Sequence, residues 1–421
     1  MNAQSDATPT TNCGPLGIGA ANGTRPLRLQ IFERIRARGP VSRAQVAKDL
    51  GISPGTVSTL TADLIEAGVL RAVEVARDPI DVARGRPPVG LAVDPGAFCA
   101  AGVKLSSRER TGIVVDFAGN ILASDRREVL PEELTVEGQI AGIGEMVDAM
   151  LGEVGRPRRE LSALGVGLPG FIDHAAGRVF WSPVLDRRPV RFAAMATEAL
   201  GLPVTIDNDA NLVALAELWF GKGRALSDFA VVTIEQGVGM GVVLDHRLFR
   251  GANGLGLELG HVKVQIDGAL CRCGQRGCLE AYLADYAIAR EAVVALRLGT
   301  DRLPAIPRLI ERLQEDADRG NAAARAVFDN ARRHLAVGLA NAVNLLDPSM
   351  LILSGGRMKY DWLDQTALLD EMRRHVIDAD QATPDFLVHE WGDLLWAHGA
   401  AALALDFVTE TEIGPAREAV A

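Results

Sequence analysis

The chain lacks the patterns that mark membrane proteins and secreted proteins. No run of about 18 apolar residues, the length of a membrane-spanning helix, occurs without a charge or a glycine. The N-terminus has no basic start followed by an apolar stretch, as a secretory signal would have, so the cytoplasm is the expected location. A hydrophobic content of 48% in 421 residues excludes a wholly disordered chain and predicts a globular protein of several domains.

Cysteine is also scarce, and its placement excludes a disulfide framework. Of the five cysteines, Cys271, Cys273 and Cys278 stand within eight residues. A disulfide-stabilised fold spreads its cysteines along the chain, so this clustering favours a metal site. Cys13 and Cys99 stand alone and are predicted to be ordinary free thiols.

The net charge of −10 is unevenly distributed. Residues 25–90 hold 11 Lys and Arg against 7 Asp and Glu, a net charge of +4, whereas residues 91–421 carry −13. A small basic segment joined to an acidic body indicates that the basic end meets a polyanion, although uneven surface charge is the simpler alternative. Residues 1–24 are rich in Thr, Asn, Gly and Ala and are predicted to form a disordered tail.

Three short helices are predicted after the tail. Apolar residues recur at helical spacing in the first helix, which ends at Gly39. Ser42 caps the second helix, and Gln45 completes a capping box three residues later. Ser53 caps the third helix, with Pro54 at its first position.

Two short strands, at 71–75 and 89–93, follow these helices and flank a basic, proline-rich loop. Three helices and a two-stranded ribbon predict a winged helix-turn-helix over residues 25–93, with a double-stranded DNA operator as partner. Short polar groups on the third helix suit base edges or phosphates, and arginines in the loop suit phosphates. The candidate DNA contacts are Ser53, Thr56, Ser58, Thr59, Arg84 and Arg86. The alternative is a three-helix protein-interaction module with a solvated loop.

Residues 97–421 are predicted to form an α/β body of two lobes, because strand-like and helical segments are mixed throughout. The predicted strands are 100–105, 112–116, 164–168, 204–207, 229–234, 239–244 and 350–353, and the clearest helices are 210–219 and 321–346.

A complete set of zinc ligands stands in the body. His261 precedes Cys271, Cys273 and Cys278 within the loop 261–280. Three thiolates and one imidazole fill a tetrahedral zinc shell and leave no open position, so we expect structural Zn²⁺. The alternative is a chance group of buried or redox-active cysteines.

A second polar segment reads D-N-D-A-N at residues 207–211, between a strand and a helix. A carboxylate beside amides suits the recognition of hydroxyl groups, and the same carboxylate can serve as a general base. Capping of the helix by Asn208 or Asp209 is the simpler alternative.

From about residue 26 onward the chain resembles the ROK family, which groups sugar-responsive repressors, the xylose and N-acetylglucosamine types among them, with sugar kinases. The resemblance rests on G-L-P-G (167–170), D-N-D-A-N (207–211), G-L-E-L-G-H (256–261) and C-R-C-G-Q-R-G-C-L-E (271–280). It implies an actin-like, ribonuclease-H-like fold of two lobes with a sugar bound between them. By the same resemblance, the sugar contacts are Gly170, Asn208, Asp209, Glu258, His261 and Glu280, with the relict catalytic base at Asp209. Leu257 departs from the family, which has a small residue there.

The phosphate-binding segments distinguish a regulator from a kinase. The family's kinases carry D-x-G-G-T, where this chain has Lys104 in place of the aspartate and serines in place of both glycines. Their second loop, G-T-G-x-G, falls on residues 235–239, where Glu235 puts a negative charge beside the expected triphosphate. We therefore expect a transcriptional regulator, most simply a repressor, and no enzyme. A sugar kinase and a DNA-binding regulator that no longer senses sugar are the alternatives.

The predicted partners are an operator, a sugar and further copies of the chain. Operators are commonly palindromic, so a homodimer or homotetramer is expected. Sugar binding is expected to shift the population of conformations and so change the affinity for DNA.

Overall fold

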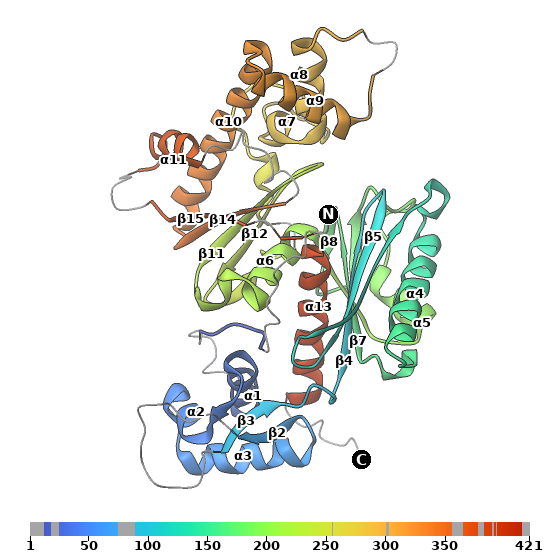
Figure 1. The fold of residues 1–421 in the computed structure, drawn as a ribbon, viewed down its shortest axis with the longest axis vertical. Coiled ribbons are helices and arrows are strands. Elements are labelled where there is room, and N and C mark those ends of the chain that lie inside the picture. Colours follow the sequence, from blue (N-terminus) through green and yellow to red (C-terminus); the bar gives the residue numbers. More distant parts are fainter. Residues whose placement is uncertain are drawn as a thin grey trace. The chain divides into compact units, whose positions relative to one another are not determined.

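A computed structural model shows the chain as two compact units (Figure 1). The structure describes residues 12–17, 25–74, 89–254, 256–299, 303–355, 365–377, 383–389, 391–392 and 394–414. Unit 1 consists of Met1–Ser227, Leu244–Leu248 and Gly392–Ala421, and unit 2 of Asp228–Val243 and Phe249–Trp391. Among the described residues, no helix is both long enough and apolar enough to span a membrane.

Unit 1 begins with the predicted winged helix-turn-helix. Its elements are α1 (Leu27–Arg38), β1 (Val41–Ser42), α2 (Arg43–Leu50), α3 (Pro54–Glu66), β2 (Leu70–Glu74) and β3 (Val89–Val93). The strands form an antiparallel sheet in the order β1-β3-β2, so β1 adds a strand that the sequence did not predict. The loop between β2 and β3, with Arg84 and Arg86, lies outside the described residues.

The predicted helix caps are present, with one exception. Ser42 Oγ accepts a hydrogen bond from the backbone N–H of Gln45, and Ser53 Oγ accepts one from Thr56 N–H. The Gln45 side chain does not return to Ser42. It donates to Asp49 Oδ1 at 2.6 Å, so the second half of the predicted capping box is wrong.

A five-stranded sheet forms the centre of the rest of unit 1, in the order β10-β7-β4-β5-β6. Its strands are β4 (Cys99–Leu105), β5 (Glu109–Asp116), β6 (Ile121–Glu128), β7 (Ala163–Leu168) and β10 (Val204–Asn208). β4, β7 and β10 are parallel, so their carboxyl ends share one edge of the sheet. The remaining short strands, β8 (Phe171–Asp173) and β9 (Arg178–Trp181), pair with each other.

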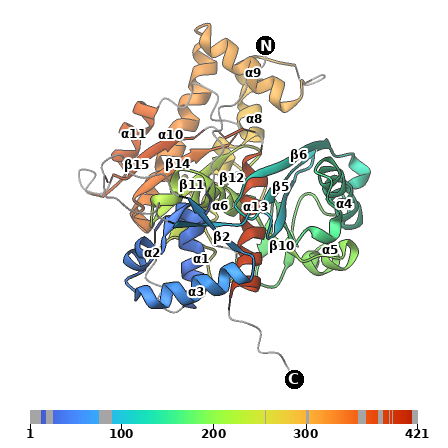
Figure 2. The ribbon, with the colours of Figure 1, turned by 60° about the horizontal axis from the view of Figure 1, so that its bottom comes forward.

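Helices cover both faces of this sheet. Figures 1 and 2 show α4 (Val136–Glu153) and α5 (Phe192–Leu200) on one face and α13 (Leu395–Val408) on the other. α6 (Asp209–Phe220) packs against α13. Glycines let α13 approach closely, because a Cβ at Gly102 or Gly165 would lie 2.3 Å or less from the α13 backbone.

Unit 2 contains most of a second five-stranded sheet, in the order β13-β12-β11-β14-β15. The strands are β11 (Phe229–Ile234), β12 (Val238–Leu244), β13 (Arg247–Phe249), β14 (Met350–Ser354) and β15 (Asp385–Val388). The helices are α7 (Glu280–Leu283), α8 (Asp285–Ala295), α9 (Ile306–Asp318), α10 (Ala322–Leu346) and α11 (Gln365–Arg373). Two mixed sheets with flanking helices confirm the predicted α/β body of two lobes.

Residues 12–17 depart from the predicted disordered tail. Cys13 is fully buried, and burial raises the pKa of its thiol to about 11. The backbone N–H of Gly14 donates to Trp219 O at 2.8 Å, and that of Leu16 donates to Arg224 O at 2.6 Å. Composition did not reveal this segment, because it is held by partners that lie far away in the sequence.

Candidate functional site

The four predicted metal ligands meet in unit 2. The ligand atoms of His261, Cys271, Cys273 and Cys278 all lie within 4.8 Å of one another. Cys271 Sγ is 3.7 Å from His261 Nδ1, and Cys273 Sγ is 3.7 Å from Cys278 Sγ. Metal–ligand bonds of about 2.0–2.3 Å in a tetrahedral shell place neighbouring ligand atoms roughly 3.5–3.8 Å apart, so these residues fit Zn²⁺.

The loop that carries the ligands is shaped by glycines and anchored by aromatic residues. Gly277 has a φ of 78°, and a Cβ there would lie 1.9 Å from Gln265 O. The Tyr282 ring stacks on His334 of α10 with 3.8 Å between ring centroids, and both side chains contact the Gln265 amide oxygen. The loop is therefore fixed to α10 by contacts that do not involve the ligand atoms.

Three predicted sugar residues lie at the carboxyl edge of the parallel strands in unit 1. Asn208 caps α6 by accepting a hydrogen bond from Ala210 N–H, and its amide donates to Gly170 O at 2.8 Å. Gly170 has a φ of 121°, and a Cβ there would lie 2.1 Å from Trp181 O. Asn208 thus caps the helix, as the simpler alternative for this segment predicted, and its amide also holds the turn at Gly170.

Asp209 is the first residue of α6 and accepts a hydrogen bond from Ala210 N–H at 3.0 Å. Burial raises the pKa of its carboxyl above the ordinary value, and the ammonium of Lys104 partly offsets that rise. Lys104 belongs to β4, and its Nζ lies 3.5 Å from the centroid of the Trp396 ring. A lysine and a tryptophan are therefore packed near the relict base position, a pairing that sequence reasoning missed.

Three further residues support this edge, and of these only His174 lies outside the polar segment 207–211 that the sequence singled out. Asp207 is 1% exposed and accepts hydrogen bonds from Asn208 N–H and from the Asn211 amide, both at 2.8 Å. His174 Nδ1 lies 2.9 Å from Ile206 O and 3.9 Å from Asp207 Oδ2. Ile206 and Asp207 are both buried, so β10 does not alternate here, and the D-N-D-A-N segment was the sequence signal that pointed to Asp207.

The other three predicted sugar residues, Glu258, His261 and Glu280, belong to unit 2. Glu258 has φ −73° and ψ 62°, and Leu259 N–H donates to Leu257 O across it, which makes an inverse γ-turn. Leu257 itself has a φ of 68°, a left-handed conformation that suits glycine better than leucine. His261 presents Nδ1 to Cys271, so Nε2 lies on the other side of the ring.

The segments aligned with the kinases' phosphate loops form closed turns. Ser106 Oγ accepts hydrogen bonds from Arg108 N–H and Glu109 N–H, and Ser106 N–H donates to Glu109 O. In unit 2, Glu235 N–H donates to Gly237 O. These backbone N–H groups are engaged within their own turns.

The predicted DNA contacts on α3 differ in their availability. Ser53 Oγ is the helix cap and lies 2.8 Å from Thr56 Oγ1, and Ser58 Oγ donates to Pro54 O. Thr59 is exposed. Ser53 and Ser58 are exposed as well, so these residues differ in the hydrogen bonds that their hydroxyls make rather than in exposure.

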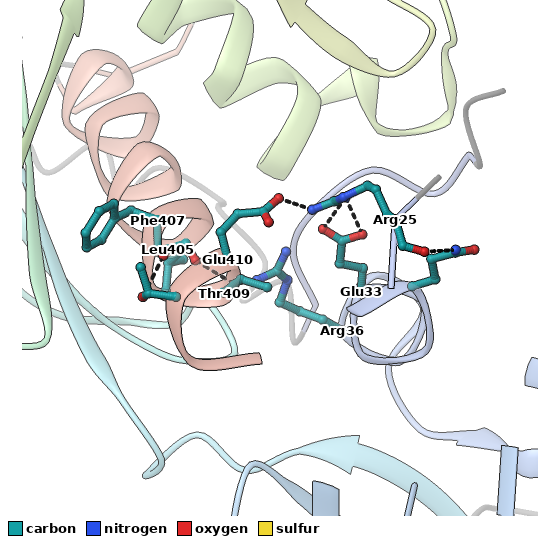
Figure 3. A network of polar contacts seen from close by, with 9 residues as sticks. Arg25, Glu33, Arg36, Leu405, Phe407, Thr409 and Glu410 are labelled. Carbon is teal, nitrogen blue, oxygen red and sulfur yellow. Dashed lines mark hydrogen bonds and ion pairs between the residues drawn. The ribbon is translucent and has the colours of Figure 1, made fainter. Parts of the chain in front are cut away.

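Helix α1, the first of the winged helix-turn-helix, contacts the body through a polar network (Figure 3). Arg36 is 2% exposed, donates to Thr409 Oγ1 at 2.6 Å and lies 4.3 Å from the centroid of the Trp219 ring on α6. Arg25 pairs with Glu33 at 2.8 Å and also contacts Glu410. Thr409 and Glu410 lie in a short π-helical extension of α13, Thr409–Ile413.

Comparison with known proteins places these features in a family. The ROK family matches residues 100–407, and a winged helix-turn-helix DNA-binding family matches residues 24–71. The DNA-binding transcriptional dual regulator NagC of Escherichia coli (strain K12) is 29% identical over 329 residues, 77% of this chain and 79% of that protein. The xylose repressor of Caldicellulosiruptor bescii is 27% identical over 331 residues, 77% of this chain and 82% of that protein.

Kinases are also among the relatives. The glucokinase of Streptomyces coelicolor is 28% identical over 313 residues, 72% of this chain and 96% of that enzyme. The crystal structure of a ROK family transcriptional regulator, a homologue of the E. coli MLC protein, matches with a TM-score of 0.77 and 22% identity, over 92% of this chain and 98% of that one. This likeness confirms the predicted fold, a winged helix-turn-helix followed by an actin-like body. The chain therefore belongs to the ROK family.

Proposed function

We propose that this protein is a transcriptional repressor of carbohydrate-utilisation genes whose operator binding is controlled by a sugar. Residues 25–93 form its DNA-binding domain, and residues 97–421 form its sensing and oligomerisation body. The winged helix-turn-helix match and the similarity to NagC and a xylose repressor support this assignment.

The observation that carries the proposal is that one helix joins the two functions within unit 1. α6 begins at Asp209, a predicted sugar contact, and Trp219 near its end lies under Arg36 of α1. Ten residues of helix span about 15 Å. A sugar that shifts the start of α6 would therefore move the surface that α1 of the DNA-binding domain contacts.

A kinase activity is the second candidate, and the similarity to a glucokinase keeps it in consideration. Lys104 stands in place of the expected aspartate, and the turns at Ser106 and Glu235 use backbone N–H groups that a triphosphate would need. Phosphoryl transfer depends on positioning and charge neutralisation, so we propose that the body binds sugar without phosphorylating it.

We propose structural Zn²⁺ at His261, Cys271, Cys273 and Cys278, which would hold the loop that also carries Glu280. These four residues would donate all the bonds of a tetrahedral zinc shell, which would leave no open position for catalysis. The oligomer is proposed to be a homodimer or a homotetramer, because the half-sites of a palindromic operator mirror two-fold protein symmetry.

Two measurements test these assignments. A coupled ATP assay with glucose, xylose and N-acetylglucosamine should show no sugar-dependent ADP release, and turnover would establish the kinase alternative. In a reporter strain, the Asp209→Ala repressor should stay on DNA under the sugar that induces the wild type. Unchanged induction in Asp209→Ala would remove Asp209 from the sugar site.

A further inference from the structure

The hydroxyl of Tyr286 lies between a predicted metal ligand and a predicted sugar ligand. Its oxygen is 3.6 Å from Cys271 Sγ and 3.4 Å from Glu280 Oε1, and it accepts a hydrogen bond from Arg272 N–H at 3.4 Å. We propose that Tyr286 is a positioning residue that couples the metal site to the Glu280 carboxylate. The sugar role of Glu280 in this inference rests on the proposed function.

Tyr286 is held in this place from two directions. It is the second residue of α8, and the guanidinium of Arg272 lies 4.1 Å from the centroid of its ring. The preceding residue, Asp285, donates its backbone N–H to Glu235 O at 3.0 Å. The same helix start therefore contacts both the metal loop and the turn at residues 235–237.

The Glu280 carboxylate lies beside another acceptor on the side that Tyr286 occupies, so it needs a hydrogen-bond donor there. Its Oε1 lies 3.6 Å from Cys271 Sγ, which carries negative charge when it is a metal ligand. A phenol O–H between two acceptors can donate its single proton to either of them, and this reduces their repulsion. Without that hydroxyl, the carboxylate would turn away from the thiolate.

The opposite side of the carboxylate is closed by the backbone. A Cβ at Gly237 would lie 3.1 Å from Glu280 Oε2, so a larger residue there would crowd the carboxylate oxygen. Glu280 is thus confined between Tyr286 and the turn that replaces a phosphate loop. A metal ion that holds Cys271 in place would therefore also hold the Tyr286 hydroxyl, which contacts the Cys271 sulfur. That hydroxyl would in turn hold the Glu280 carboxylate. The coupling is reciprocal, so a group bound to Glu280 must also change the affinity for metal.

Cobalt(II) provides the test, because its absorption bands report directly on the thiolates. We would load the whole protein with Co²⁺ and compare Tyr286→Phe with Tyr282→Phe, whose hydroxyl contacts the same loop at Ala269 N–H and Gln265. Loss of an outer partner of a metal ligand typically costs about 10- to 100-fold in metal affinity. We expect weaker Co²⁺ binding and a shifted sulfur-to-cobalt band in Tyr286→Phe only. Equal effects in both variants would reduce Tyr286 to a packing role and overturn the inference.

A double-mutant cycle then tests the coupling without any sugar. Glu280→Gln should alter the cobalt band and affinity in the wild type, and much less in the Tyr286→Phe protein. Additive effects would contradict coupling through Tyr286. Finally, N-acetylglucosamine, glucose and xylose are added to each protein. A band shift in the wild type that Tyr286→Phe abolishes supports the full inference. If the double-mutant effects are non-additive but none of the three sugars shifts the cobalt band, the positioning role of Tyr286 stands and the sugar role of Glu280 is overturned.

Discussion

The guanidinium of Arg36 lies 4.3 Å from the centroid of the Trp219 ring, so helix α1 of the DNA-binding domain contacts the helix that begins at Asp209. Arg36 also donates to Thr409 beyond the end of α13. One buried arginine therefore joins α1 to two helices of the body. We expect it to carry the signal from the sugar site to the DNA-binding domain.

Replacing Arg36 by methionine keeps an apolar side chain of similar length and removes the contacts with Thr409 and Trp219. The hydrogen bond to Thr409, which has a charged donor, contributes about 1.5–3 kcal/mol. We expect operator affinity without sugar to persist and the effect of sugar on that affinity to disappear. An intact coupling amounts to about 5- to 150-fold. Arg38→Met is the matched control, because Arg38 lies on the same helix and pairs with Asp49. A sugar response equal to that of the wild type would contradict this role of Arg36.

Asp209→Asn should stabilise the protein at neutral pH. Burial raises the carboxyl pKa in the folded state above the value of 3.8 in the unfolded chain, so the folded state holds its proton more tightly. The wild type therefore loses stability as pH rises from about 4 through the folded-state pKa, and asparagine removes that loss. Chemical denaturation between pH 4.5 and 7.5 should show an advantage of the variant that grows with pH. An advantage that is absent or falls with pH would refute the argument.

Removal of metal should abolish the sugar response and spare the DNA-binding domain. The four ligands lie in unit 2, and the helix-turn-helix lies in unit 1. Chelation or Cys273→Ser should lower the melting temperature and eliminate sugar-dependent release, while operator binding without sugar remains. Readdition of Zn²⁺ should restore the chelated wild type but not Cys273→Ser. Metal-free protein with a full sugar response would exclude a structural role for the ion in sensing.

Two substitutions on α3 separate DNA contact from helix capping. Thr59→Ala should weaken specific binding by about 0.5–1.5 kcal/mol, the contribution of one neutral hydrogen bond, with no loss of stability, because its side chain is exposed. Ser53→Ala should cost about 1 kcal/mol of folding stability, because Ser53 caps α3. Binding titrations and thermal melts distinguish the two. If Thr59→Ala leaves specific affinity unchanged, α3 does not present this residue to DNA.

Leu257→Gly should be neutral or stabilising. A left-handed conformation costs an L-residue about 1–2 kcal/mol, whereas glycine adds about 0.5–1 kcal/mol of unfolded-state entropy. The β-branched control Leu257→Val should lower the melting temperature, because valine tolerates a positive φ less well. A lower melting temperature for Leu257→Gly than for Leu257→Val would show that the leucine side chain has a packing role there.

Short sequence patterns predicted most of the helices and strands, but they did not predict contacts between residues that lie far apart in the sequence. The helix predicted over residues 321–346 is α10, and Asn321, which the prediction placed within the helix, is its N-cap. β1 has only two residues, too few to show an alternating pattern. The buried position of Cys13 depends on Trp219 and Arg224, which no local pattern links to it.

In the candidate site too, residues close together in the sequence were predicted, and contacts between separate elements were not. The spacing of cysteines predicted the metal ligands, because a short loop forces them together. The contacts of Lys104 with Trp396, and of Tyr286 with Glu280, depend on how separate elements pack. The residue types of Trp396 and Tyr286 did not indicate that they would contact Lys104 and Glu280.

The most direct test of the account is fluorescence anisotropy of the protein on the DNA upstream of its own gene. The salt concentration is fixed, because affinity for DNA depends steeply on it. Monosaccharides, amino sugars and their phosphates are added in turn to the wild type and to Asp209→Ala. We predict specific binding that one sugar relieves in the wild type and not in the variant. Binding that no sugar alters, or no specific binding to any upstream fragment, would contradict a sugar-controlled repressor.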